Sequence, residues 1–260
     1  MSNASNPRRK FIQICAIGGA AGIGCATSQD ACANARTPSI AGDLPPAKKT
    51  GAIASAKRYA RVKLVDRDGR AVLAKSLKAN HNYVFNYPFE STPCFLLNLA
   101  RAVNAADELV TERGESYVWP GGVGPSNNIV AYSAICAHKL AYPSPQISFI
   151  SYRDKPSPLS PKGNVIGCCA DKSAYDPANG ARVLGGPAPQ PLATILLEHD
   201  PKTDELFAVG TLGGEKFDEF FTKYAFKLSL ESGSSRAKQA VSATTVLRDL
   251  SAYSAQTAQC

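Results

Sequence analysis

The sequence has little of what identifies several protein classes. Its eight cysteines are too few, over 260 residues, for a small fold that disulfides hold together. It has no basic run with interleaved aromatic residues, so its net charge of +8 does not indicate a nucleic-acid-binding protein. No internal repeat is visible, and histidine occurs only three times. What remains is the apolar and aromatic content of an ordinary globular protein, at a length that allows one large or two small domains.

The first 35 residues predict an export signal. Residues 6–12 (NPRRKFI) contain a twin-arginine pair, and a weakly apolar run rich in Gly and Ala follows from 11 to 26. Residues 33–35 (ANA) match an A-x-A cleavage site. The apolar run is shorter and richer in Gly than a typical transmembrane helix. The protein would be attached to a membrane only if this leader were retained as an anchor. The twin-arginine pathway exports folded proteins, so we expect a protein that folds in the cytoplasm and works in the periplasm. The alternative interpretation of the basic residues is an ordinary start before a helix.

Residues 36–57 are rich in Pro, Ala and Lys and show no periodicity, which predicts a linker. The predicted leader carries three basic side chains and one acidic one, so the chain without it has a net charge of +6. This positive excess is spread along the chain and favours acidic partners.

Many short strands separated by turns are predicted between residues 58 and 214. Residues 59–65 alternate in polarity up to an Asp-Arg-Asp-Gly turn, as a half-buried strand does. Further strands are predicted at 82–87, 94–99, 129–135, 147–152, 164–167, 192–198 and 205–210. This pattern is typical of an all-β domain.

Residues 215–260 are predicted to form a helical C-terminal extension. The first helix, at 215–224, has an aromatic face made of Phe217, Phe220, Phe221 and Tyr224. The second, at 236–253, has a stripe of Ala and Leu at helical spacing. Core packing is the simpler interpretation of both stripes, and a groove for a partner is the alternative.

Two short segments carry side chains that bind metals. The segment AICAHKL places the Cys136 thiol and the His138 imidazole two residues apart. The segment CCADKSAYDP places the Cys168 thiol three residues before the Asp171 carboxylate. Thiolates are the ligands of iron–sulfur clusters, and imidazole and carboxylate also suit iron. These residue types are ones that can hold a metal between two loops.

These segments resemble the two ligand boxes of Rieske [2Fe–2S] proteins. The segment 185–192 (GGPAPQPL) resembles the proline loop that covers the cluster in that family. Residues 121–133 before the first box and 197–210 after the second are similar to parts of the small subunit of arsenite oxidase. The resemblance covers roughly 59–214. It implies a Rieske-type antiparallel β-sandwich with a cluster-binding lobe at about 134–192.

In a Rieske centre two Cys thiolates bind one iron and two His nitrogens bind the other. The resemblance implies that Cys136 and Cys168 bind the inner iron and that His138 binds the outer one. Asp171 stands where the family has its second histidine, and it is the first candidate for the fourth ligand.

Cys169 is the other candidate for the fourth ligand. It could instead form a disulfide with Cys94 in an oxidising compartment, while Cys260 is expected to be incidental. Respiratory Rieske proteins have a disulfide across the cluster loops, and this chain has Ala141 and Ala170 at those two positions.

The resemblance also implies roles around the cluster. Ser173 and Tyr175 match the positions whose hydroxyls donate hydrogen bonds to the cluster sulfurs and raise its potential. Gly186 and Pro187 lie in the proline loop.

Two functions are consistent with these residues. The first is an exported [2Fe–2S] electron-transfer protein or subunit that is not a catalyst by itself. The resemblance implies a molybdenum oxidoreductase large subunit as one partner and a cytochrome c or a copper protein as the other. The alternative is a Rieske-fold binding or assembly subunit that has lost its cluster, or one with a structural zinc site made by Cys136, His138, Cys168 and Cys169.

Overall fold

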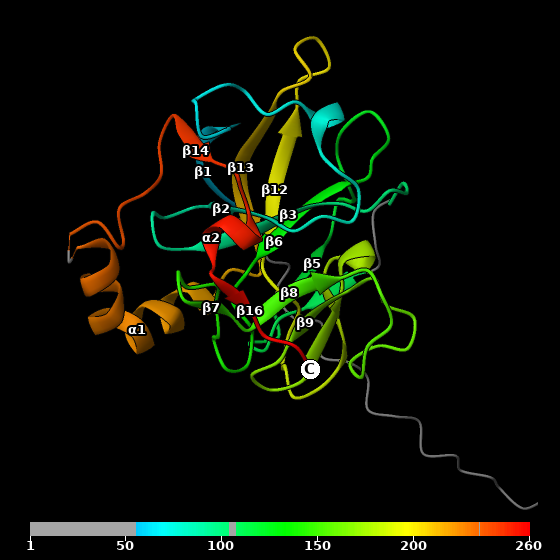
Figure 1. The fold of residues 1–260 in the computed structure, drawn as a ribbon, viewed down its shortest axis with the longest axis vertical. Helices are drawn as coiled ribbons and strands as arrows, with labels where there is room; N and C mark the ends of the chain where they lie inside the picture. Colours follow the sequence, from blue (N-terminus) through cyan, green and yellow to red (C-terminus); the bar gives the residue numbers. More distant parts are fainter. Residues whose placement is uncertain (1–55, 104–107, 234) are drawn as a thin grey trace, which may run out of the picture. The chain divides into compact units, whose positions relative to one another are not determined.

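The computed structural model describes residues 56–103, 108–233 and 235–260. The predicted export signal and nearly all of the predicted linker lie outside the described residues. The described chain is mostly β, which confirms the predicted fold class (Figure 1). None of its described helices is long and apolar enough to cross a membrane.

The main sheet has eight strands in the order β14-β1-β13-β12-β6-β3-β2-β15. The strands are β1 (Lys57–Val65), β2 (Tyr83–Asn86), β3 (Pro93–Asn98), β6 (Ile129–Ser133), β12 (Thr194–His199), β13 (Leu206–Leu212), β14 (Thr244–Val246) and β15 (Arg248–Asp249). All neighbours are antiparallel except β1 and β14. Only Leu247 separates β14 from β15, although they lie at opposite edges of the sheet. The sheet must therefore curl until its two edges lie side by side.

A smaller sheet forms a lobe beyond the main sheet. Its order is β11-β10-β9-β8, made of β8 (Ile150–Arg153), β9 (Val165–Cys168), β10 (Ser173–Asp176) and β11 (Arg182–Gly185). Two short strands, β7 (Ile147–Ser148) and β16 (Gln256–Thr257), pair in parallel beside this lobe (Figure 1). A hairpin of β4 (Glu108–Val110) and β5 (Ser116–Val118) completes the β structure.

Helical structure is limited to α1 (Lys216–Ser232), the single turn α2 (Leu250–Tyr253) and two 3₁₀ turns, η1 (Ala74–Ser76) and η2 (Pro177–Asn179), within the described residues. The aromatic face predicted for α1 is confirmed, because Phe217, Phe220 and Phe221 are buried in the core. Tyr224 departs from helical geometry and kinks α1, and the helix continues beyond this point to Ser232.

The helix predicted at 236–253 is wrong. This segment begins with turns, supplies β14 and β15 to the two edges of the main sheet, and is helical only over the single turn α2. Thr244, Thr245 and Val246 are β-branched and favour strands. An open sheet edge offers unpaired backbone N–H and C=O groups, and pairing with them stabilises strands here more than the helical spacing of Ala and Leu stabilises a helix.

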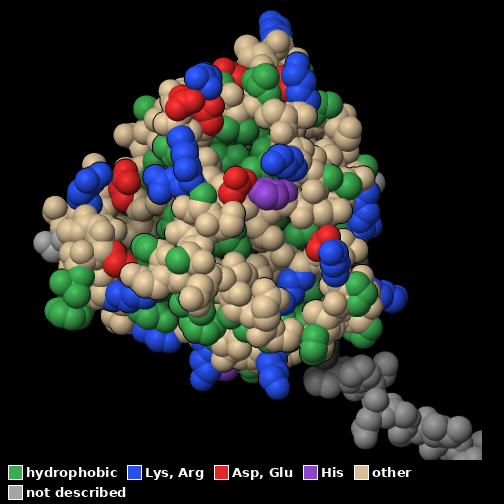
Figure 2. All heavy atoms as spheres, viewed as in Figure 1, with side chains coloured by type: hydrophobic (Ala, Val, Ile, Leu, Met, Phe, Trp, Pro, Cys, Tyr) green, Lys and Arg blue, Asp and Glu red, His purple; other side chains and the backbone are tan. Residues whose placement is uncertain are grey.

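Two apolar clusters make up the core. One lies between the main sheet and α1. The other joins the main sheet to the lobe and contains Trp119, Tyr132 and Tyr175 together with Cys136 and Cys168. Both thiols of the predicted iron centre therefore belong to the core that holds the lobe in place. On the face drawn in Figure 2 the Lys and Arg side chains are dispersed and do not gather in one patch.

Candidate metal centre

The two ligand boxes are short loops at the ends of strands. The first box leaves β6, which is hydrogen-bonded on both sides within the main sheet. The second box is the tight connection between β9 and β10, where Cys168 pairs with Ser173. Each loop is thus held by a sheet, the first by the main sheet and the second by the lobe.

The two loops have the same local geometry. The backbone N–H of Leu140 donates to the Cys136 carbonyl at 3.0 Å, and that of Lys172 donates to the Cys168 carbonyl at 2.8 Å. In each case the donor is four residues after the cysteine and has a left-handed backbone, with φ of 57° at Leu140 and 63° at Lys172. The left-handed backbone conformation destabilises a residue other than glycine by about 1–2 kcal/mol, and such strain often occurs at functional sites.

Three of the five predicted metal ligands meet at one point. The thiol sulfurs of Cys136 and Cys168 and a carboxylate oxygen of Asp171 all lie within 4.8 Å of one another. The Cys136 thiol donates to Asp171 Oδ2 at 3.1 Å, and His138 Nδ1 lies 3.0 Å from the same oxygen. Both thiols are fully buried and the Asp171 side chain is 2 % exposed, whereas the His138 side chain is 34 % exposed. The site therefore has a buried sulfur end and an imidazole that faces solvent.

The charges of these groups suit metal binding. Burial by itself would raise the pKa of the Asp171 carboxyl, but the Ser173 backbone N–H, which donates to it at 2.9 Å, contributes to a pKa below the ordinary value. The hydrogen bond with Cys168 lowers the pKa of the Cys136 thiol, while the same contact raises that of Cys168. Metal ligands bind in their deprotonated forms, so the lowered pKa values of Asp171 and Cys136 favour a cation here, whereas the raised pKa of Cys168 opposes it.

Two hydroxyls lie beside this donor set. Tyr175 accepts a hydrogen bond from the Ala137 backbone N–H at 3.2 Å, and its oxygen lies 3.4 Å from the Cys136 sulfur. Ser173 is fully buried, and its Oγ has no hydrogen-bond partner among the described residues. A buried hydroxyl without a partner is costly, so this one, opposite Cys168 in the β9–β10 pairing, suits a site that holds a further acceptor.

The predicted proline loop lies against the second box. Gly186 has φ of +84°, and a Cβ at this position would lie 2.5 Å from Ser173 Cα and 2.6 Å from the Lys172 carbonyl oxygen. Only glycine fits both the backbone angle and the space. Pro187 follows at the exposed surface. This segment therefore packs closely against the second box.

The prediction that Cys169 supplies a ligand is wrong, because Cys169 forms a disulfide with Cys260. The possible Cys94–Cys169 disulfide is also wrong. Cys94 is a free, fully buried thiol that donates to the Tyr87 carbonyl at 2.9 Å. The zinc site that would have used Cys169 as its fourth ligand is excluded for the same reason.

Cys260 is the residue whose importance the sequence did not reveal. The sequence contains one indication of a disulfide: the export motif predicts an oxidising compartment, where cysteines outside the metal centre tend to pair. That signal could not choose among partners, because the two cysteines are 91 residues apart in the chain.

The comparisons with known proteins show only a partial similarity. No family model matches the sequence. Among solved structures, the chain is similar to the soluble domain of the Rieske protein II (soxF) from Sulfolobus acidocaldarius, with a TM-score of 0.43 and 28 % sequence identity. The match covers 59 % of this chain and 78 % of that one.

Proposed function

We propose that this protein is a Rieske-type [2Fe–2S] electron-transfer protein or subunit with no substrate reaction of its own. The observation that supports this most strongly is the convergence of Cys136, Cys168 and Asp171 between two loops, with His138 beside them. When bound, the cluster supplies a one-electron redox couple. The residues present fit such a group, because two thiols, an imidazole and a carboxylate are all ligands that iron accepts.

Three of the four candidate ligands, Cys136, Cys168 and Asp171, have buried side chains, and His138 is the exposed one. Cys136 and Cys168 would hold the inner iron from within the core, while His138 and Asp171 would hold the outer one. The Ser173 hydroxyl has no partner among the described residues, so it is free to donate toward sulfur. The 34 % exposed imidazole of His138 is the ligand that a redox partner could approach.

We also propose that the protein is exported and works in the periplasm. The twin-arginine motif supports this, and the Cys169–Cys260 disulfide is consistent with an oxidising compartment. By resemblance to the small subunit of arsenite oxidase, its partners would be a molybdenum oxidoreductase and a cytochrome c or a copper protein. Retention of the leader would add a membrane anchor.

One contact favours the alternative of a Rieske-fold binding or assembly subunit that has lost its cluster. Cys136 donates directly to Asp171, so part of the donor set satisfies itself without a metal. A zinc ion held by Cys136, His138, Cys168 and Asp171 is the remaining form of the zinc alternative.

Absorption and metal analysis separate these possibilities. The protein, produced in a host that assembles iron–sulfur clusters and exports it, should be coloured and should contain equal amounts of iron and acid-labile sulfide. A colourless protein that contains zinc, or one without metal, would exclude the electron-transfer function.

A further inference from the structure

We infer that residues 254–260, here called the clasp, hold the two ligand boxes in their relative positions, and that the Cys169–Cys260 disulfide locks the clasp. The placement of the boxes is a property of the fold alone. Its consequence for a cluster rests on the proposed function.

The clasp is bound on one side to the chain that follows the first box. Ser254 Oγ donates to the Ser144 carbonyl at 2.7 Å, and the Ala255 backbone N–H donates to the Pro145 carbonyl at 2.8 Å. The strands β16 and β7 then pair in parallel, and the Ala258 N–H donates to the Ser148 carbonyl at 2.8 Å. The bound segment leads back to Ala141, whose carbonyl accepts from the Cys136 N–H at 2.9 Å. The first box is thus connected to the clasp through a short hydrogen-bonded stretch.

On its other side the clasp is bound to the second box. Cys260 forms its disulfide with Cys169, which is the residue directly after Cys168 and two residues before Asp171. The Arg153 guanidinium reinforces this contact, since its Nη2 donates to the Ala258 carbonyl at 2.8 Å and lies 2.9 Å from Cys169 Sγ.

The chain between the boxes gives a reason for such a connection. His138 and Cys168 are separated by 29 residues, and residues 154–164 of that stretch form no helix or strand. The two boxes also contact each other directly, because Cys136 and His138 hydrogen-bond to Asp171, and the Cys169 N–H donates to the Phe149 carbonyl at 2.7 Å. This chain has Ala141 and Ala170 at the positions of the loop disulfide of respiratory Rieske proteins. The clasp instead joins the two boxes by a disulfide on one side and by hydrogen bonds on the other.

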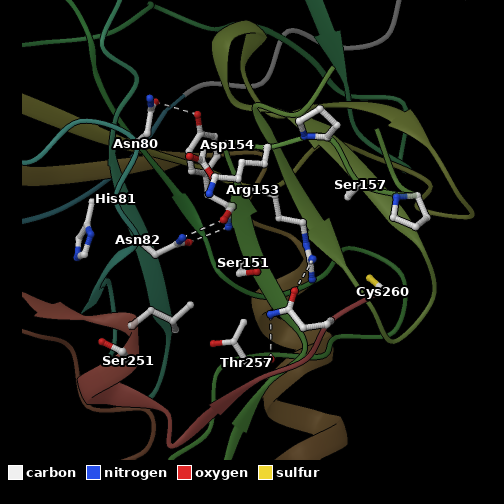
Figure 3. Close-up of a pocket in the computed structure, with 16 residues that line it drawn as sticks. Asn80, His81, Asn82, Ser151, Arg153, Asp154, Ser157, Ser251, Thr257 and Cys260 are labelled. Atoms are coloured by element: carbon white, nitrogen blue, oxygen red, sulfur yellow. Dashed lines mark hydrogen bonds between the residues drawn. The ribbon is translucent and has the colours of Figure 1, made fainter. Parts of the chain in front are cut away.

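The disulfide is accessible, whereas the thiols of the metal centre are not. Cys260 lines a cleft of about 820 Å³, together with Arg153, Thr257 and Gln259. Figure 3 shows Cys260 and Arg153 in the wall of this cleft. Cys260 also lines a second hollow of about 320 Å³ next to Lys172 and Gly186. Cys136 and Cys168 are fully buried, so a small dithiol should reach the clasp first.

The test compares hydrogen exchange of the backbone amides before and after the disulfide is opened. Dithiothreitol breaks the Cys169–Cys260 bond, leaves two thiols and is itself oxidised to its cyclic disulfide. A double variant, Cys169→Ser with Cys260→Ser, opens the same link without leaving a thiol that could bind metal.

Exchange in residues 134–142 and 168–173 should become at least about tenfold faster after reduction, because the disulfide then no longer restricts local opening of the two boxes. Exchange in the β12–β13 hairpin should not change. Dithiothreitol should have no further effect on the double variant. In coloured protein the visible spectrum should shift on opening, while the far-ultraviolet circular dichroism stays constant.

The outcomes separate this inference from the proposed function. Equal exchange in both boxes before and after reduction of the wild-type protein would overturn the clasp, whatever the colour of the protein. Faster exchange in a colourless protein would support the clasp and would contradict the electron-transfer function. If the double variant fails to fold, the reduction of the wild-type protein still decides the matter.

Discussion

Gly186→Ala tests whether the proline loop needs its close approach to the second box. Two costs follow from the structure. A side chain at φ of +84° loses about 1–2 kcal/mol, and a Cβ placed 2.5 Å from Ser173 Cα must displace backbone, for which overpacking costs about 1–3 kcal/mol. The sum is about 2–5 kcal/mol, which for a chain of this size should lower the thermal midpoint by at least about 4 °C.

Two other glycines separate these costs. Gly114 has φ of +81°, but a Cβ added there would meet nothing within 4 Å. Gly114→Ala should therefore lower the free energy of unfolding only by the cost of the left-handed backbone. Gly185 has neither a left-handed backbone nor a neighbour within 4 Å, so Gly185→Ala should stay within about 0.5 kcal/mol of the wild type. Urea unfolding of the four proteins gives the comparison. A Gly186→Ala protein as stable as the Gly185→Ala protein would refute the close contact between the loop and the box.

Three further predictions concern the ligands and the export signal. Cys136→Ser should lose iron and sulfide, since a hydroxyl does not replace a thiolate at neutral pH, whereas Cys94→Ser should retain both; retention of iron in the first would exclude that ligand. Asp171→His should raise the reduction potential measured by redox titration, because it removes one negative charge from a centre that we expect toward or below the lower part of the range of about −150 to +300 mV. An unchanged potential and spectrum in Asp171→Ala would show that the carboxylate does not bind. Arg8→Lys with Arg9→Lys should keep the protein in the cytoplasm, as fractionation would show, and normal periplasmic yield would contradict the export assignment.

The local part of the site could be predicted from the sequence. The spacings of Cys136 to His138 and of Cys168 to Asp171 each describe one loop, and a loop of this size fixes its own geometry through one hydrogen bond between residues four apart. Gly186 could be identified because its neighbours form a recognisable Gly- and Pro-rich segment.

The long-range part could not be predicted. The pairing of Cys169 with Cys260 depends on where β16 lies, and β16 is placed by β7, which lies far earlier in the chain. Residues 236–253 combine a helical spacing of Ala and Leu with three consecutive β-branched side chains at 244–246, so the sequence alone supports either structure. The two edges of the curled sheet decide between them, and those edges exist only after the rest of the sheet has formed.

Pulsed electron paramagnetic resonance of the reduced protein, made with isotope-labelled histidine, tests most directly whether Cys136, Cys168, His138 and Asp171 hold a cluster. We expect coupling to one imidazole nitrogen, from His138, because His81 and His199 are hydrogen-bonded to Asp249 and Asp204. Coupling to two imidazoles, coupling to none, or the absence of any signal from the reduced protein would contradict it.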